Sequence, residues 1–494
     1  MTEAVLDPPL ARPRPASLKA DAVQGVKWSA AGQAARIGVG LVATSVLAYL
    51  LGPQEFGLVG MAGVVVGFVT LCKDLGTGAA VVQKQRPTDV ELATIHWLNV
   101  AVGALGALVL LALAPLCAHF FREPRLFPLV ATLGVALLVS GPGVVAQSLL
   151  QKRLDFRALA LAETVSTSAG AVAGITLALL GAGAWSLVVQ AITMQAAATW
   201  LNLRASRYVP LRVFRAGTLR SVLRFSFGLT TFNVFNFCAR NADQVLIGRV
   251  LGAADLGLYA LAYRLVLQPL GSVHAIVGRV MFPLYSRIQE DDARLAAAFL
   301  RVLGVIAFLL LPALAGLGAI ATPLVEALFG PSWAPTAPLM TLLAGVAGAQ
   351  TVVGVAGLLY QCKGRTDWMG RWGIVSSVIA VAGFGFGLAG GARGVALAFL
   401  CVSLLLAVPG VMLPCRLVGI RLREIGATIA RPLAGSLLLA LALTWLDPRL
   451  QGMTPLLRTA TLIGAGVALY TLYALLGDRA RLREVLQLCR GVRP

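Results

Sequence analysis

Charged residues are scarce in this 494-residue chain, and their scarcity excludes most classes of soluble protein. Only 13% of the residues are charged, whereas 58% are hydrophobic. Soluble globular proteins carry about 25% charged residues, so this sequence cannot cover a water-exposed surface of the usual kind. Soluble enzymes, secreted domains and disordered chains are therefore excluded, and a polytopic membrane protein is predicted.

Metal-binding and nucleotide-binding motifs are also missing. The three histidines stand far apart in the sequence, and the seven cysteines form no C-x-x-C pair. Because metal sites need ligands at short, regular spacings, the sequence predicts no metal site and no cofactor. It also lacks a G-x-x-x-x-G-K-[ST] phosphate loop, so the chain is not itself an ATP-driven pump.

Apolar stretches of membrane-spanning length make up most of the chain. We count fourteen, with approximate limits 30–51, 56–82, 93–118, 127–150, 158–181, 183–203, 222–247, 256–283, 297–321, 335–361, 369–391, 393–415, 426–446 and 456–477. In lipid each segment must satisfy its own backbone hydrogen bonds, which a helix does. We expect an all-α, polytopic integral membrane protein with about 14 transmembrane helices.

The distribution of basic residues sets the expected topology. A net charge of +20 would suggest nucleic-acid binding in a soluble protein, but in a membrane protein Lys and Arg collect in the cytoplasmic loops. With the N-terminus inside, most of the 41 Lys and Arg residues face the cytoplasm. The outer segments hold only Arg122, Arg125, Arg249, Arg393, Arg449 and Arg458. This asymmetry predicts a multi-pass protein of the bacterial inner membrane, with both termini cytoplasmic and no nucleic-acid partner.

An internal repeat divides the chain into halves. The sequence LGPQEFGL at 51–58 returns as LGAADLGL at 251–258, each time between two spans. Six spans separate the copies, so the halves should be related by a pseudo-two-fold axis along the membrane normal. The expected domains are a disordered cytoplasmic tail (1–27), a six-helix bundle (28–203), a cytoplasmic connecting loop (204–221), a second six-helix bundle (222–415), two additional transmembrane helices (416–477) and a cytoplasmic basic tail (478–494).

Polar side chains inside the spans are the candidate functional residues, because charges at membrane depth are costly. In the seventh span, steps of three and four place a set of polar residues on one helical face. These are Asn233, Asn236, Arg240, Asp243 and Gln244. The repeat offset aligns Arg36 with Asn236 and Gly40 with Arg240, so both halves present an arginine within about one turn.

We interpret Arg36, Arg240, Arg264 and Lys73 as the lining of a cationic cleft that receives phosphate or pyrophosphate, together with Asn233, Asn236 and Gln244. Arginine suits this task because its planar guanidinium donates two hydrogen bonds to one phosphate group. In the alternative interpretation Arg240 pairs with Asp243 in its own helix, and Arg36 extends toward the membrane surface.

Three acidic residues lie within the spans and are candidates for ion coupling: Glu163, Asp243 and Asp74. A carboxylate at membrane depth that can be protonated couples transport to a proton or cation gradient. Alternatively, Glu163 is structural and binds the nearby hydroxyls of Thr164, Ser166 and Thr167 or an arginine of a span.

Six short segments carry a resemblance to a known family. They are LGPQEFG (51–57), DLGTGAAVVQ (74–83), QKRLDF (151–156), GAW (183–185), DQVLIGRVLGAADLGLY (243–259) and GRTD (364–367). Through them the chain resembles polysaccharide-unit flippases of the multidrug/oligosaccharidyl-lipid/polysaccharide exporter superfamily, in the colanic-acid-exporter-like branch. Members vary in which cavity charges they keep.

The resemblance implies two bundles that open alternately to either side and carry an undecaprenyl-pyrophosphate-linked oligosaccharide repeat unit across the inner membrane for polysaccharide biosynthesis. The expected partners are this lipid-linked substrate, membrane lipids, a polysaccharide polymerase and glycosyltransferases, around a monomeric protein. Two alternatives remain within the superfamily, a lipid-linked peptidoglycan-precursor flippase and a cation-coupled multidrug exporter. A membrane enzyme is disfavoured because the outer loops are short and poor in acidic residues and histidine.

Overall fold

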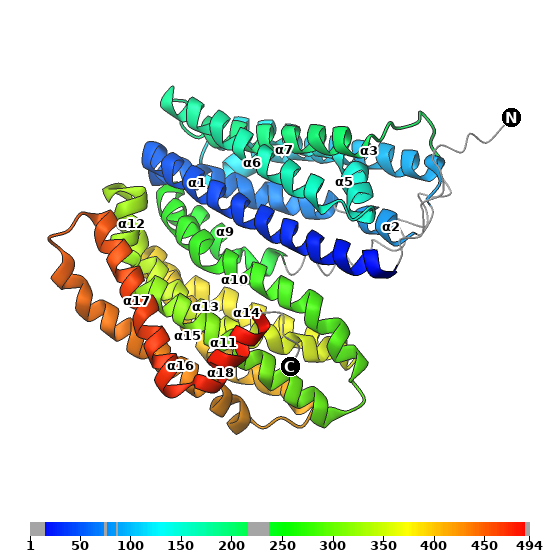
Figure 1. Ribbon diagram of the computed structural model, residues 1–494. Coiled ribbons are helices and arrows are strands. Elements are labelled where there is room, and N and C mark those ends of the chain that lie inside the picture. The colour runs from blue at the N-terminus through cyan, green and yellow to red at the C-terminus, as the bar shows by residue number, and fades with distance from the viewer. Residues whose placement is uncertain (1–14, 74–76, 85–86, 216–236, 490–494) are drawn as a thin grey trace. The chain divides into compact units, whose positions relative to one another are not determined.

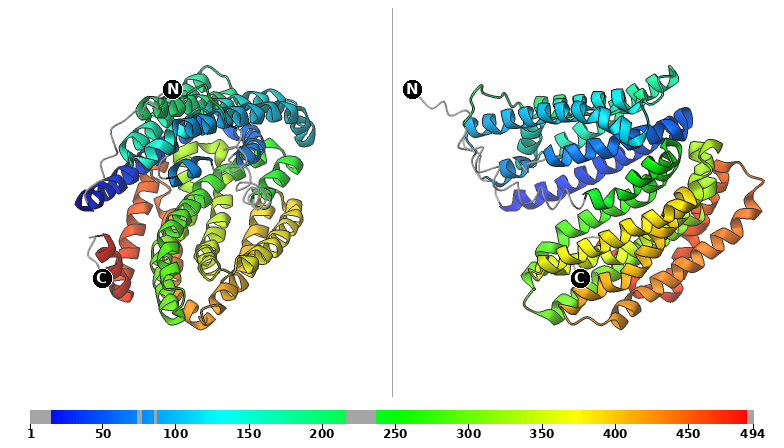
Figure 2. Two further views of the ribbon diagram at one scale, coloured as in Figure 1. Left: turned by 90° about the vertical axis from the view of Figure 1, so that its right-hand side faces the viewer. Right: turned by 180° about the vertical axis from the view of Figure 1, so that it is seen from behind.

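The structure, a computed structural model, describes residues 15–73, 77–84, 87–215 and 237–489. Every regular element in these ranges is a helix (Figures 1 and 2). The chain forms two compact units, Met1–Leu50 with Val65–Asn236, and Leu51–Val64 with Phe237–Pro494. We call them the first and the second unit.

The first unit contains most of the helices of the N-terminal half. They are α1 (Pro15–Lys73, in part), α2 (Thr77–Gln83), α3 (Asp89–Phe121), α4 (Leu126–Ser140), α5 (Gly143–Lys152), α6 (Phe156–Leu179) and α7 (Trp185–Ser206). Helices α6 and α7 form a hairpin that turns at Gly181, whose φ is +79°. Helices α4 and α5 bend by 45° across the Gly-Pro-Gly sequence at 141–143 and together are long enough for one span.

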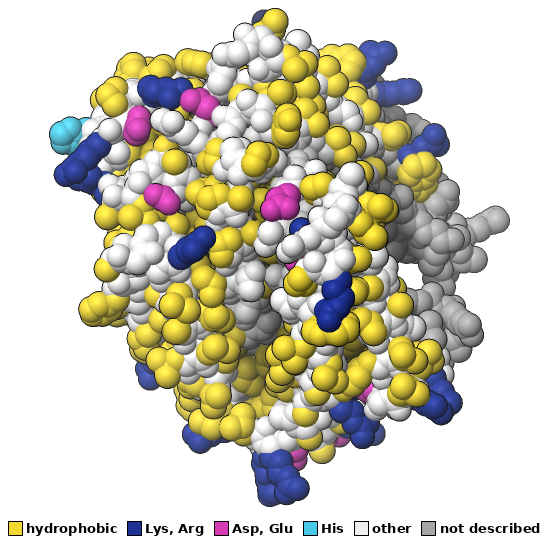
Figure 3. All heavy atoms as spheres, turned by 90° about the vertical axis from the view of Figure 1, so that its left-hand side faces the viewer, with side chains coloured by type: hydrophobic (Ala, Val, Ile, Leu, Met, Phe, Trp, Pro, Cys, Tyr) yellow, Lys and Arg dark blue, Asp and Glu magenta, His cyan; other side chains and the backbone are white. Residues whose placement is uncertain are grey.

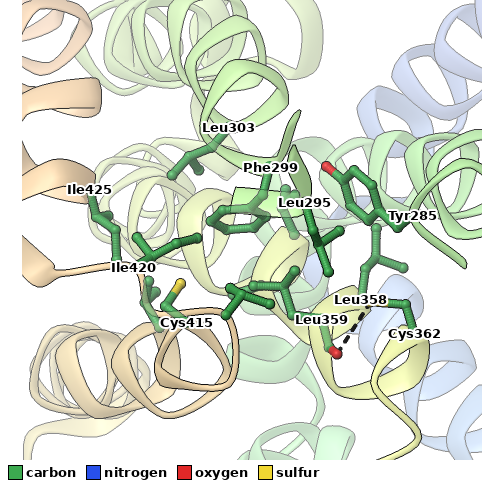
Figure 4. Packing of buried hydrophobic residues seen from close by; sticks show 14 of the residues in the cluster. Tyr285, Leu295, Phe299, Leu303, Leu358, Leu359, Cys362, Cys415, Ile420 and Ile425 are labelled. Atoms are coloured by element: carbon green, nitrogen blue, oxygen red, sulfur yellow. Dashed lines mark hydrogen bonds between the residues drawn. The ribbon is translucent and has the colours of Figure 1, made fainter. Parts of the chain in front are cut away.

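The second unit contains α9 (Ala242–Val250), α10 (Ala253–Arg287), α11 (Asp292–Ala319), α12 (Ala321–Phe329), α13 (Thr336–Cys362), α14 (Thr366–Gly387), α15 (Gly391–Arg416), α16 (Leu422–Leu446), α17 (Pro455–Gly477) and α18 (Arg479–Cys489). Short 3₁₀ turns lie at Pro331–Trp333, Leu388–Gly390 and Asp447–Leu450. A hydrophobic core fills the space between α10, α11, α13 and α15. Figure 4 shows Phe299 at its centre. Beside it lie Cys415 from the end of α15, Ile420 from the following turn and Ile425 from the start of α16.

Helices occupy the predicted spans wherever the structure describes them. Most of the stretch at 222–247 lies outside the described residues. By length and composition alone, nine helical segments within the described residues could each cross a membrane, or ten with the bent pair, and some contain two predicted spans. The all-α membrane architecture is thus confirmed, whereas the count of fourteen stays a prediction.

The outer surface of the helices is apolar, as a lipid environment requires. Leu180, Phe386 and Leu476 have 79%, 86% and 71% of their surface exposed. Hydrophobic side chains cover much of the face drawn in Figure 3. Because an exposed apolar surface of this extent is unstable in water, the fold is that of a multi-pass membrane protein.

The internal repeat has a counterpart in the backbone. Gly52 and Gly252, which are repeat mates, have φ angles of +73° and +95°. Only glycine adopts such conformations without strain, which explains why both copies keep it. At Gly52 the backbone breaks α1 into two helices.

The repeat segments also pack on each other within the second unit. A Cβ atom at Gly57 would overlap the carbonyl oxygen of Ala253, and one at Gly257 would overlap the carbonyl oxygen of Pro53. Since Pro53 and Ala253 are themselves repeat mates, the contact is reciprocal. This close approach places Leu51–Val64 in the second unit, although the sequence alone predicted one bundle over 28–203.

One further boundary differs from the expectation. Helix α1 begins at Pro15, inside the stretch 1–27 that we expected to be a disordered tail. Between Pro15 and Gly25 the sequence contains neither glycine nor a further proline, so helix formation is not interrupted there. Residues 1–14 lie outside the described part of the chain.

Candidate functional site

Among the predicted polar residues that the structure describes, Asp243 is the most buried, with 1% of its surface exposed. Its carboxylate accepts a hydrogen bond of 2.7 Å from the Tyr259 hydroxyl and one of 2.8 Å from the backbone N–H of Gln244. These donors compensate for the loss of hydration that burial imposes on a carboxylate. Tyr259, on α10, is itself fully buried. The sequence predicted Asp243 but missed Tyr259, which is one apolar-flanked tyrosine among several.

Arg240 lies one turn before Asp243 and is exposed. No ion pair joins the two within the described residues, because Asp243 takes its hydrogen bonds from Tyr259 and Gln244. Arg240 still acts electrostatically on Asp243, Tyr263 and His274. The backbone turns at Asn241, where φ is −111°, so the polar face expected on one continuous helix is interrupted there.

Arg264 lies on α10, two turns after Asp255, in the middle of an apolar sequence. Its side chain is exposed, and it forms no ion pair or hydrogen bond with any residue that the structure describes. A guanidinium without a partner at membrane depth requires water or an anionic ligand.

The predicted cations of the first unit have local partners. Arg36 is exposed and donates a hydrogen bond of 2.7 Å to the side-chain oxygen of Gln33, one turn earlier on α1. Lys73 ends α1 and donates to the hydroxyl of Ser140, at the end of α4. Arg36 and Lys73 belong to one unit and Arg240 and Arg264 to the other, so the cleft expected between the halves stays a prediction.

Three of the predicted residues, Asn233, Asn236 and Asp74, lie outside the described residues. Glu163 is described and half-buried on α6. The hydroxyls of Ser166 and Thr167 donate to the backbone carbonyl of Glu163, at 3.0 and 2.7 Å, rather than to its carboxylate. No described residue hydrogen-bonds to that carboxylate, and the role of Glu163 in ion coupling stays a prediction.

A polar pocket that the sequence analysis did not identify lies within the first unit. Its volume is about 790 Å³, and it is lined by Thr70, Lys73, Gly78, Val82, Gln83, Asn99, Val144, Gln147, Ser148 and Gln151. The lining comes from α1, α2, α3 and α5, which meet at one end of the unit (Figure 1). Of the residues on our initial list, the pocket contains Lys73. The feature of the sequence that could have indicated this pocket is the pair Gln147 and Gln151, which are four residues apart at the end of an apolar stretch.

The bend between α4 and α5 shapes this pocket. A Cβ atom at Gly141 would lie 2.6 Å from the backbone oxygen of Asn99, and one at Gly143 would lie 2.9 Å from the Thr199 hydroxyl. Both glycines therefore hold the bend tightly against α3 and α7. Behind the pocket, Leu92, Ile95 and Leu149 form part of a small hydrophobic cluster with Val81 and Val145.

The connecting segment after α7 covers the same end of the unit. Trp97 on α3 donates a hydrogen bond of 2.8 Å to the backbone oxygen of Leu211, and the Arg153 guanidinium donates one of 3.1 Å to the oxygen of Ser206. Tyr208 packs on His96, with ring centroids 5.7 Å apart. Burial and the negative charge of Asp89 raise the pKa of Tyr208 to about 12. The tyrosine hydroxyl is thus neutral at physiological pH and adds no charge to this end of the unit.

A second cavity, in the second unit, is apolar. It has a volume of about 810 Å³ and lies between α11, α13, α15 and α16. Its lining includes Leu314, Gly345, Gly348, Leu400, Leu404, Leu433 and Leu437, and its polar members are Thr322, Thr341, Ser436, Thr444 and Asp447. We call it the apolar groove. Helix α16 belongs to the pair that follows the two predicted bundles, so the pair contributes directly to this cavity.

Comparison with known proteins decides the family. The sequence profile of the family described as "Polysaccharide biosynthesis protein" matches residues 46–338, more than half of the chain. The chain belongs to this family. Its relatives include the lipopolysaccharide biosynthesis protein WzxC of Escherichia coli K12, which is 30% identical over 79% of this chain and 80% of the relative. The succinoglycan biosynthesis transport protein ExoT of Rhizobium meliloti is 30% identical over 95% of this chain and 96% of its own.

Two solved transporter structures share the fold of this chain. The inward closed conformation of the lipid II flippase MurJ matches with a TM-score of 0.70 at 14% identity, over 92% of this chain and all of that one. An inward-facing multidrug resistance MATE transporter of the MOP superfamily matches with a TM-score of 0.59 at 16% identity, over 79% of this chain and 94% of that one. At this level of identity the likeness establishes the fold. The resemblance predicted from the six sequence segments is confirmed.

Proposed function

We propose that this protein is a flippase that moves a lipid-linked oligosaccharide repeat unit across the inner membrane for polysaccharide biosynthesis. The observation that carries the proposal is the relationship to ExoT, a succinoglycan biosynthesis transport protein, over 95% of the chain. WzxC, named for lipopolysaccharide biosynthesis, supports the same conclusion. The relatives are named as biosynthesis and transport proteins, and the protein is a transporter rather than an enzyme.

The physical task is to carry a charged, hydrophilic head across about 30 Å of hydrocarbon. Arg36, Arg240 and Arg264 would replace the hydration of an undecaprenyl pyrophosphate, with Asn233, Asn236 and Gln244 completing the lining. The guanidinium of Arg264 supports this assignment most strongly, because no described residue binds it and a phosphate group could accept its hydrogen bonds. Lys73, the fourth predicted cation, lines the polar pocket of the first unit. The two bundles would open alternately to either side.

The polyprenyl chain needs an apolar path beside the head group. The apolar groove meets this need, since apolar side chains dominate its lining and its volume of about 810 Å³ falls within the range of small-ligand sites. A chain in the groove would remain shielded from water while the head group crosses. Helix α16 would then line the path of the polyprenyl chain rather than contact the sugar.

Coupling to an ion gradient would use a carboxylate at membrane depth. Glu163 is the first candidate, because its carboxylate is half-buried without a described partner. Asp243 is the second, since protonation would weaken its bond with Tyr259. Asp74 is the third, on the sequence alone.

We place both termini in the cytoplasm, the protein in the inner membrane as a monomer, and a polysaccharide polymerase and glycosyltransferases among its partners. The basic bias of the inner segments supports this orientation. The peptidoglycan-precursor and multidrug alternatives are supported only by similarity of fold to solved structures that are 14% and 16% identical to this chain. The polysaccharide function is supported by two relatives that are each 30% identical to this chain.

The test uses a host strain in which the gene has been deleted. Surface polysaccharide should disappear and lipid-linked repeat units should accumulate, and the wild-type gene should reverse both effects. Arg240→Ala and Arg264→Ala should each fail to restore polymer at normal protein levels. Arg279→Ala is the matched control, because Arg279 on α10 donates to its own helix backbone, at the oxygen of Ala275. Normal polymer in both variants would contradict the cationic-site mechanism, and normal polymer in the deletion strain would contradict the function.

A further inference from the structure

The polar pocket of the first unit has a composition that differs from both a phosphate site and a lipid site. Its polar lining consists of four side-chain amides and the hydroxyls of Thr70 and Ser148, with Lys73 as its one cation. The amides belong to Gln83, Asn99, Gln147 and Gln151. A pyrophosphate, with several negative charges, would be poorly balanced by one ammonium group that already donates to Ser140.

The four side-chain amides differ in whether other described residues already hydrogen-bond to them. Asn99 is buried, donates 2.8 Å to the backbone oxygen of Ile95 and accepts 3.0 Å from the Thr77 hydroxyl. The side chains of Gln83, Gln147 and Gln151 form no hydrogen bond with any residue in the described ranges. Each offers two N–H donors and a carbonyl acceptor. Such groups at the end of a membrane span need water or a polar ligand.

Gln147 and Gln151 are placed to bind one ligand together. They are four residues apart on α5, so they lie on the same side of the helix, one turn from each other. Gln83 faces the same cavity from α2, and Gly78 lets α2 approach α5, since a Cβ there would lie 3.0 Å from the Ser148 hydroxyl. The pocket extends inward as far as Asn99, about 15 Å along α3 from Asp89.

Sugar hydroxyls match this set of groups. Each hydroxyl both donates and accepts, as each amide does, and neutral partners avoid the cost of burying uncompensated charge. A volume of about 790 Å³ falls within the range of small-ligand sites and accommodates more than one sugar ring. The predicted topology opens this end of the first unit to the cytoplasm, where a repeat unit would be loaded.

We infer that the polar pocket binds the sugar residues of the repeat unit, separately from the site for its pyrophosphate. The inference rests on the proposed function and deepens it. Gln147 and Gln151 are the central recognition residues, and Gln83 contributes from α2. The identity of the lining side chains would then determine which repeat unit is accepted.

The experiment measures equilibrium binding to purified full-length protein in lipid nanodiscs. The probe is the radiolabelled repeat-unit oligosaccharide, released by mild acid from the lipid-linked intermediates that accumulate in the deletion strain, so it carries neither lipid nor phosphate. Wild-type protein should bind it, and inorganic pyrophosphate should not compete. The double variant Gln147→Ala/Gln151→Ala should weaken binding at least tenfold, because two hydrogen bonds are lost.

Two further variants test whether binding takes place in the polar pocket: one fills the pocket, and the other is a control in the second unit. Val82→Phe should also reduce binding, because it fills the pocket from an exposed position on α2 without removing a polar contact. Gln361→Ala, which removes an exposed amide near the end of α13 in the second unit, should bind like wild type. Competition by pyrophosphate, no oligosaccharide binding to wild type, or equal binding by Gln147→Ala/Gln151→Ala and Gln361→Ala would each overturn the inference. Because polymer export in the complemented strain is measured separately, such a result leaves the flippase function standing.

Discussion

Two cavities lined by described residues have nearly the same volume and opposite chemistry. The polar pocket of the first unit measures about 790 Å³ and presents four amides, whereas the apolar groove of the second unit measures about 810 Å³ and is lined mainly by aliphatic side chains. The apolar groove takes one wall from α16, which follows the two repeated halves, so the two cavities do not occupy equivalent places in the repeat. In the proposed function the polar pocket would hold the sugars and the apolar groove the polyprenyl chain.

A charge introduced into the apolar groove should give the largest effect. Leu404→Lys on α15 would place an ammonium group where we expect the polyprenyl chain, at a cost of about 3 kcal/mol. We expect surface polysaccharide to fall at least tenfold, measured in the complemented deletion strain at equal protein level. Leu404 is 57% exposed, so the substitution removes little packing.

Leu405→Lys provides the matched control for this experiment. Leu405 is 67% exposed and follows directly on the same helix, but it does not line the groove. Both lysines carry a similar cost of membrane insertion, because they lie at nearly the same depth. Equal loss of polymer in the two variants would indicate a general insertion defect and remove the groove from the mechanism.

The reciprocal glycine contact permits a sharper test of where the second unit begins. Gly57→Ala should destabilise the protein by about 1–3 kcal/mol, because its Cβ would overlap the carbonyl oxygen of Ala253. The midpoint of thermal unfolding in detergent measures the effect. Gly63→Ala, two turns further along the same helix, has no atom within 4 Å of the added Cβ and should leave the midpoint unchanged. If both variants unfold like wild type, Leu51–Val64 does not pack on α10 as described.

The smallest effect is expected at the polar end of the groove. The Arg458 guanidinium donates to both oxygens of Asp447, at 2.7 and 2.6 Å, and the two side chains are only 12% and 18% exposed. Arg458→Lys removes the paired geometry and should cost about 1 kcal/mol, seen as a lower unfolding midpoint. Arg294→Lys, whose pair with Asp291 is largely exposed, should have no measurable effect. A midpoint unchanged by Arg458→Lys would show that this pair does not stabilise the groove.

The predicted site shows how far single residues can be interpreted without a structure. Asp243 and Arg264 were identified because charges are rare in apolar sequences, and the structure places one in a hydrogen-bonded core and leaves the other open. The partner Tyr259 was missed, since tyrosine is common near membrane helices. Gln147 and Gln151 were missed because uncharged amides stand out less, and because their meeting with Gln83 depends on α2 and α5 packing together.

The sequence by itself determined the architecture, because apolar stretches in lipid have no alternative to helices. The bias of Lys and Arg predicts how these helices are oriented. The sequence also determined the repeat, since Gly52 and Gly252 are required by positive φ. Only the tertiary structure decided that Leu51–Val64 packs with the second unit and that a 45° bend turns α5 into the wall of a polar pocket. Helix formation depends on neighbours a few residues apart, whereas a cavity depends on side chains that meet only after distant helices have packed.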